Sequence, residues 1–179
     1  MTTTILNVDA TETDLLLRAR QSAITFLADT IDKIEGTITL LNNELSNASL
    51  ELSFEADENN GIIKHLSKPQ KTNSFLEIKQ QHSIRFKSVS FEKVNTEINF
   101  LKGNLTINDR TNTVEFEARI VPIENQNITH KVLFEILGKL NRQDFDLNMN
   151  TEIDYKSSSI NQFINVTASF VFTATQQLN

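Results

Sequence analysis

Apolar and polar residues alternate with a period of two over residues 100–120, FLKGNLTINDRTNTVEFEARI. Before a polar turn the apolar series includes Leu105 and Ile107, and after the turn Val114 and Phe116 continue it. Successive side chains of a strand point to opposite faces of the sheet, so this pattern places the apolar residues on one face. The stretch therefore predicts a β-hairpin with one apolar face, which packs on a solid core, contacts another protein or lines an apolar cavity.

Strands of the same kind are predicted along most of the chain, joined by short polar turns such as Asn42-Asn43. A helical assignment fails because, at 100° per residue, acidic residues such as Glu51 and Glu115 would fall among the apolar positions. An early strand is expected over residues 13–27, where three consecutive leucines obscure its face. The remaining strands are predicted within residues 34–40, 47–57, 82–88, 131–140 and 161–175.

About eight strands with one apolar face predict an all-β fold, either a closed antiparallel barrel or a sandwich. Residues 59–81 interrupt the alternation, and Ile62, Ile63 and Leu66 have the spacing of a helical turn. A second short helix is expected from Asn73 or Ser74 onward, so the chain is predicted to carry a short helical insertion around residues 60–80. The insertion either covers one mouth of a barrel or packs on the outer surface.

Composition restricts the classes of function. The 179 residues suggest a single domain over 1–179, and the net charge of −6 without a basic stripe argues against nucleic acid as a partner. Cysteine is absent, so disulfides and thiol chemistry are excluded. Twelve phenylalanines against one tyrosine and no tryptophan favour a large interior without polar groups.

The N-terminal sequence lacks the basic and apolar regions of a secretory signal, and no stretch has the length of a transmembrane helix. We expect a cytoplasmic protein, or a periplasmic one whose signal was removed.

Catalytic and metal-binding patterns are weak. The three histidines, His65, His82 and His130, are far apart in sequence and form no ligand pair, so no metal site is predicted. Asp144 and Asp146 could form a carboxylate pair, but a solvated turn is the simpler interpretation, and no catalytic residue is assigned. We expect a protein that is not an enzyme and has no cofactor.

Several of these stretches resemble the YceI-like family of lipocalin-like, polyisoprenoid-binding proteins of bacteria. The strand HSIRFKSVSF, the hairpin at 100–120, the block NRQDF at 141–145 and the segment IIKHLSKPQKTNSFLEI carry the resemblance in the family's order. Matching positions include Gly103, Asn104, Leu105, Thr106, Ile107, Thr111, Val114, Phe116, Asn141, Arg142, Asp144, Phe145, Leu147, His65, Leu66, Ser67 and Phe75.

The resemblance implies an extended, eight-stranded antiparallel barrel whose lumen binds an isoprenoid, an isoprenoid quinone or a fatty-acid-like lipid. It also makes a homodimer plausible. Arg142 would then lie at the barrel rim near a ligand head group, although a turn arginine is the simpler interpretation. The ligand-binding residues predicted on this basis are Leu52, Phe54, Ile62, Ile63, Leu66, Phe75, Ile84, Phe86, Leu105, Ile107, Val114, Phe116, Phe134, Ile136, Arg142, Phe145, Phe170 and Phe172.

Two hypotheses lead, and an enzyme that uses Asp144, Asp146 or a histidine ranks last. The barrel is a non-catalytic carrier, sequestering protein or sensor for a long apolar ligand, or it is a solid scaffold that binds another protein through its outer face or through residues 59–81. Lipids extracted from the purified protein would separate the two.

Overall fold

The computed structural model describes residues 2–18, 22–26, 32–56, 62–65, 82–95, 97–123, 130–145 and 163–174. These segments form strands and two short 3-10 helices. In chain order the elements are β1 (Thr3–Val8), η1 (Ala10–Glu12), β2 (Asp14–Arg18), β3 (Ser22–Phe26), β4 (Asp32–Leu41), β5 (Glu44–Ala56), β6 (Ile62–His65), β7 (His82–Lys93), β8 (Asn99–Ile107), β9 (Arg110–Pro122), β10 (Lys131–Asn141), η4 (Arg142–Phe145) and β11 (Phe163–Ala174).

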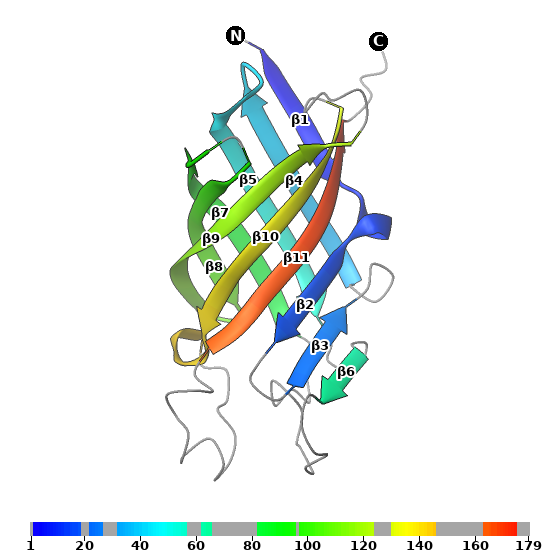
Figure 1. Cartoon of the computed structure of the whole chain (residues 1–179), viewed down its shortest axis with the longest axis vertical. Helices are drawn as coiled ribbons and strands as arrows, with labels where there is room; N and C mark the ends of the chain where they lie inside the picture. Colours follow the sequence, from blue (N-terminus) through cyan, green and yellow to red (C-terminus); the bar gives the residue numbers. More distant parts are fainter. Residues whose placement is uncertain are drawn as a thin grey trace.

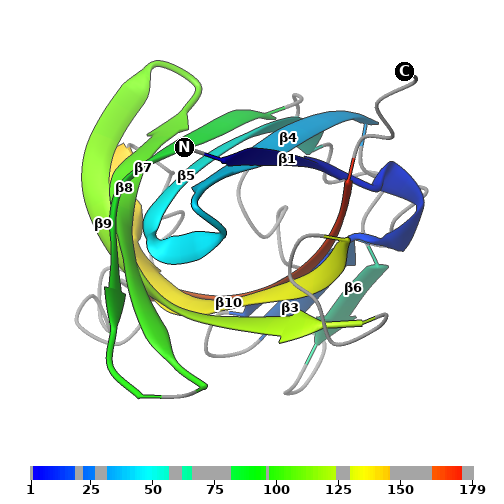
Figure 2. The ribbon, with the colours of Figure 1, turned by 90° about the horizontal axis from the view of Figure 1, so that it is seen from above.

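The strands form one antiparallel sheet in the order β1-β4-β5-β7-β8-β9-β10-β11-β2-β3-β6, and β1 also pairs with β11. This last pairing closes eight strands into a barrel, which confirms the predicted fold class. Figure 1 shows the barrel with the start of β1 and the end of β11 at its upper end, and Figure 2 shows the closed ring of strands from above. Strands β2, β3 and β6 extend the sheet beside the lower part of β11 (Figure 1).

The strand that closes the barrel is not the one expected from the sequence. The stretch predicted as one strand at 13–27 forms the hairpin β2–β3, and β1, which lies before it, pairs with both β4 and β11. The strand that closes a barrel must form hydrogen bonds with the strands at both ends of the sheet. The local sequence pattern does not show which segment does so, because these two strands are distant in sequence. The run of leucines therefore predicts a strand correctly, but this strand, β2, lies outside the closed ring.

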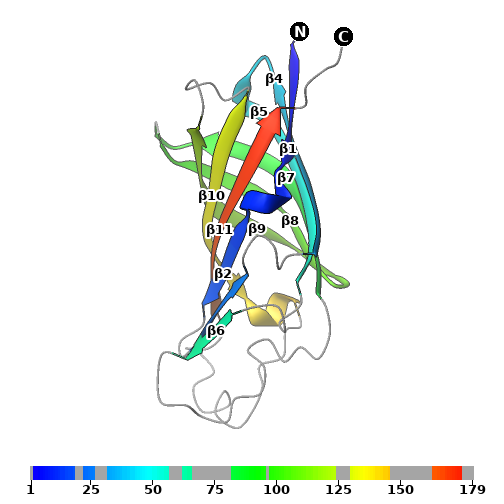
Figure 3. The same cartoon turned by 90° about the vertical axis from the view of Figure 1, so that its right-hand side faces the viewer.

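Strands β1 and β2 both pair with β11, at different levels of it, and are separated by η1. Figure 3 shows η1 as a short coil between them. Val8 lies opposite Phe172 and Asp14 lies opposite Ser169, so the first segment advances six residues while β11 advances three. The three extra residues loop out as η1. The Asp9 side chain accepts hydrogen bonds from the Thr11 backbone N–H at 2.9 Å and the Thr11 hydroxyl at 2.6 Å. These bonds lower the pKa of Asp9.

The helical turn predicted at Ile62–Leu66 is wrong for its described part. Residues Ile62–His65 form β6, which pairs antiparallel with β3. A segment of four residues with two adjacent isoleucines fits the period of a helix as well as that of a strand. Hydrogen bonding to the edge of β3 favours the strand. The second helix, expected from Asn73 or Ser74 onward, lies outside the described residues.

Asparagines form the tight turns of two hairpins. Asn42 and Asn43, between β4 and β5, have φ angles of 55° and 59°, and Asn108, between β8 and β9, has a φ angle of 56°. Asparagine tolerates this left-handed backbone better than most residues, and a two-residue turn with a positive φ at both positions, as at Asn42-Asn43, matches the twist of the flanking strands. These turns fix the register of the flanking strands.

Candidate functional site

Most of the predicted ligand-binding residues lie on strands of the barrel and face its interior. The described inward side chains of the eight barrel strands include no charged residue. Ile84 and Val114 are partly buried and pack against the hydrophobic core. The residues that are buried in that core are Leu52, Phe54, Phe86, Leu105, Ile107, Phe116, Phe134, Ile136, Phe170 and Phe172.

Four other predicted residues are not among the described residues of this wall. Ile62 and Ile63 belong to β6, which is the third strand beyond β11 and lies outside the closed ring. Leu66 and Phe75 lie outside the described residues. Their role as ligand contacts stays a prediction.

Arg142 and Phe145 lie at the lower end of the barrel in η4, which follows β10 directly (Figure 3). Both side chains are buried, with 6% of Arg142 and 3% of Phe145 exposed. The Asn112 side-chain amide donates to the Asp144 carbonyl, which ties η4 to β9, and the Gln143 N–H donates to the Asn141 carboxamide oxygen at 3.0 Å. A permanently charged guanidinium is thus held inside the protein beside an apolar wall.

Exposure of the inward side chains differs between the two halves of the barrel. In the lower half, Phe54, Leu105, Ile107, Phe116 and Ile136 are each 5–7% exposed. Ile34, Ile84 and Val114 are more accessible, whereas Ile164 is 1% exposed. In the upper half, the following side chains are at most 2% exposed and form what we call the closed layer: Leu6, Ile38, Leu40, Leu50, Leu101, Ala118, Val132, Phe134 and Phe172.

Three phenylalanines cross the barrel at the closed layer. The ring centroids of Phe91 and Phe134 are 6.2 Å apart with an interplanar angle of 83°, and those of Phe134 and Phe172 are 6.0 Å apart at 79°. Both contacts are edge-to-face, the arrangement that aromatic rings favour. We call these three residues the phenylalanine bar.

The sequence pattern missed Phe91. Phe91 follows Phe86 by an odd number of residues, so strict alternation assigns the two rings to opposite faces. A register shift between Ser88 and Ser90 inserts an extra residue in β7 and returns Phe91 to the inner face, where it is 7% exposed. The local sequence, Ser88 and Ser90 before Phe91, is too weak a signal to locate such a bulge.

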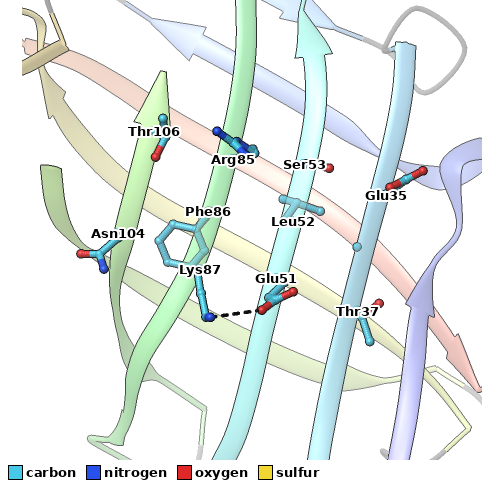
Figure 4. Close-up of a pocket in the computed structure, with 11 residues that line it drawn as sticks. Glu35, Thr37, Glu51, Leu52, Ser53, Arg85, Phe86, Lys87, Asn104 and Thr106 are labelled. Carbon is cyan, nitrogen blue, oxygen red and sulfur yellow. Dashed lines mark ion pairs between the residues drawn. The ribbon is translucent and has the colours of Figure 1, made fainter. Parts of the chain in front are cut away.

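A groove of about 510 Å³ lies against the outer surface of β4, β5, β7 and β8 (Figure 4). Its lining is mostly outward and polar, with two acidic residues, Glu35 and Glu51, and two basic ones, Arg85 and Lys87. Lys87 and Glu51 form an ion pair at 3.6 Å, and both side chains are more than 60% exposed. The charges balance in an open setting, so this groove differs in character from the apolar lumen.

The described residues include no group of three or more histidine, aspartate or glutamate side chains that could hold a metal ion. His130 and Asp144 are exposed, and Asp146, the other member of the predicted carboxylate pair, lies outside the described residues. Within the part of the chain that the structure covers, no helix has the length and apolar character needed to span a membrane.

Known proteins support the assignment of the fold. The structure of Burkholderia cenocepacia BcnA matches with a TM-score of 0.60 and 14% identity, covering 92% of this chain and 98% of that one. A YceI protein from Campylobacter jejuni matches with a TM-score of 0.56 and 17% identity, covering 82% and 84% of the two chains. A polyisoprenoid-binding domain from Saccharophagus degradans, implicated in plant cell wall breakdown, matches with a TM-score of 0.52 and 11% identity, covering 95% and 98%.

No curated protein matches the chain. Residues 6–172 match the YceI-like domain, and this range runs from the strand that closes the barrel to the phenylalanine that completes the bar. The chain therefore belongs to the YceI-like family.

Proposed function

We propose that the barrel is a non-catalytic binding protein for a long apolar ligand, an isoprenoid or another lipid chain, which it carries, sequesters or senses. The observation that carries the proposal is the lower half of the lumen, where inward apolar side chains of β4, β5, β7, β8, β9 and β10 retain accessible surface. The related Saccharophagus degradans domain, a polyisoprenoid-binding domain of the same fold, supports the class of ligand.

The free energy of burial is sufficient for such a ligand. A chain that loses roughly 400–500 Å² of apolar surface gains about 10–12 kcal/mol gross at about 25 cal/mol per Å². Association costs about 4–15 kcal/mol. The gain from burial thus exceeds the cost of association over most of that range, and a polar head group needs to contribute little.

Arg142 gives the lumen its polarity. Its charge is held at the lower end in surroundings where Coulomb interactions are stronger than in water. A ligand whose head is anionic or strongly dipolar would place that head beside η4 and its tail further up the barrel. In this proposal Arg142 orients the ligand, and the apolar wall supplies the affinity.

The experiment that tests the proposal compares two tryptophan variants of a chain that has no natural tryptophan. Val114→Trp adds bulk at an inward, partly buried position of β9, and Val121→Trp adds the same residue at an outward position, 39% exposed, on the same strand. Lipids are extracted from the native protein and from both variants and identified by mass spectrometry, and circular dichroism checks folding.

We expect a long-chain lipid in extracts of the native protein and of Val121→Trp, and at least a tenfold loss in folded Val114→Trp. Extracts free of lipid, together with no binding of added farnesol by the native protein, would refute the proposal. That outcome would favour the alternative of a solid scaffold that binds another protein.

A further inference from the structure

We infer that the phenylalanine bar ends the ligand-binding part of the lumen, so that the barrel holds only about three isoprene units of a chain, whatever the full length of its ligand. The inference rests on the proposed function and specifies how much of a ligand the site accommodates. Residues of the protein itself occupy the space above the bar.

The bar spans the full width of the barrel. Around the ring of eight strands, β7 and β11 are four strands apart in either direction, so Phe91 and Phe172 start from opposite walls. Figure 2 shows these two strands on opposite sides of the ring. Phe134, from β10, contacts both rings and is 0% exposed. A linear chain that enters from the lower end therefore meets a continuous line of three rings.

Other side chains leave no passage beside the bar. The closed layer includes residues from β1, β4, β5, β8, β9, β10 and β11, and Phe91 adds β7, so each barrel strand contributes a buried apolar side chain at this level. Interiors packed in this way have voids that are rarely larger than a water molecule. An alkyl or prenyl chain is wider than such voids.

The depth below the bar follows from strand geometry. Leu140 lies near the lower end of β10, six residues after Phe134. Six residues at about 3.4 Å each span roughly 20 Å along the strand, or roughly 15 Å along the barrel axis at a tilt of about 40°. With carbon–carbon bonds of about 1.5 Å, an extended chain advances roughly 1.3 Å per bond, so about twelve bonds fit. An isoprene unit has four carbons along the chain, so about three units fill the space.

Affinity should therefore rise with chain length and then stop rising. Each isoprene unit that leaves water for the lumen raises affinity by roughly tenfold or more, whereas a unit that stays outside adds nothing. The ligand class with the best fit has an apolar part of about fifteen carbons, and longer chains bind with the remainder outside the lower end.

The experiment measures dissociation constants of lipid-free protein for prenols of two, three, four and eight isoprene units, by native mass spectrometry or by competition with a fluorescent fatty acid. Phe134→Ala removes the middle ring of the bar, and Phe134→Leu shortens it with a smaller loss of packing, in case the alanine variant does not fold. Phe100→Ala is the matched control, because Phe100 faces outward and is 39% exposed.

We expect affinity of the native protein and of Phe100→Ala to level off at three units, and affinity of the folded Phe134 variant to rise by at least tenfold between three and four units. A continuous rise to eight units in the native protein would overturn the inference and leave the proposed function intact. The same holds if the Phe134 variants keep the native plateau. Binding of no prenol at any length would instead refute the proposed function.

Discussion

Replacing Gly138 with alanine should destabilise the barrel because an aromatic ring occupies the space where the new methyl group would lie. A Cβ atom at Gly138 would be 2.2 Å from Cδ1 and 2.9 Å from Cε1 of Phe116, on the neighbouring strand β9. Carbon atoms normally approach to about 3.5–4.0 Å. The ring would have to withdraw by more than about 1 Å into the lumen.

Two opposing terms set the magnitude. Overpacking of this kind costs about 1–3 kcal/mol. None of the described glycines has a positive φ, so alanine fits the backbone at Gly138 and gains about 0.4–1 kcal/mol from the less flexible unfolded chain. The net loss is therefore about 1–2 kcal/mol, which corresponds to a decrease in Tm of roughly 2–8 °C for a chain of this size.

Gly36→Ala is the control, because the nearest atom to a Cβ there is the end of the flexible Leu52 side chain, at 2.6 Å. This variant should be close to native in stability. Free energies of unfolding are measured in urea by circular dichroism for both variants, for Phe116→Leu and for Gly138→Ala combined with Phe116→Leu. The double variant should recover about 1 kcal/mol relative to the sum of the single effects. Strictly additive effects of Gly138→Ala and Phe116→Leu, or equal stability of Gly138→Ala and Gly36→Ala, would contradict the prediction. Either result would show that packing of the Phe116 ring does not require a glycine at position 138.

Two further predictions concern the turns. Asn43→Ala should lower the free energy of unfolding by about 1–2 kcal/mol relative to Asn43→Gly, since both lose the hydrogen bond from the Thr4 hydroxyl but only alanine is strained at a φ of 59°; equal urea midpoints would contradict this. Asp9→Asn should be less stable than the native protein at pH 6, and the difference should shrink as the pH is lowered toward 2.5. The Thr11 hydrogen bonds lower the pKa of Asp9, so its stabilisation is fully present above the unfolded value of about 3.9 and is lost as the pH falls from that value through the lowered pKa of the folded state. A difference that does not change with pH in urea titrations would rule out a role for the charge.

The alternation of apolar residues was sufficient to predict the barrel wall. It placed Leu105, Ile107 and Phe116 on the inner face, where the structure has them, because burial on one face leaves no freedom of register along a regular strand. It failed at Phe91, where a bulge shifts the face by one residue, and at β6, where four residues are too few to distinguish a strand from a helical turn.

Closure of the ring could not be predicted from local pattern. In β1 the apolar residues Ile5, Leu6 and Val8 do not alternate strictly, and Ile5 is 47% exposed. The stretch that includes Leu15 gives the stronger local signal, yet its strand β2 pairs with β11 and β3 and does not close the barrel. The closing strand is the segment that forms hydrogen bonds with the free backbone groups of β4 and β11 at the same time, and these two strands are distant in sequence.

The way the barrel closes also accounts for the difference between its two halves. β1 pairs with β4 from Thr37 to Leu41 and with β11 from Phe172 to Ala174, so β1 joins these two strands at the level of the closed layer. Below that level β11 pairs with β2, which continues to β3 and β6, while the first residues of β4 pair with β5. Among the described strands the wall therefore parts between β4 and β2 at the level where the inward side chains keep accessible surface.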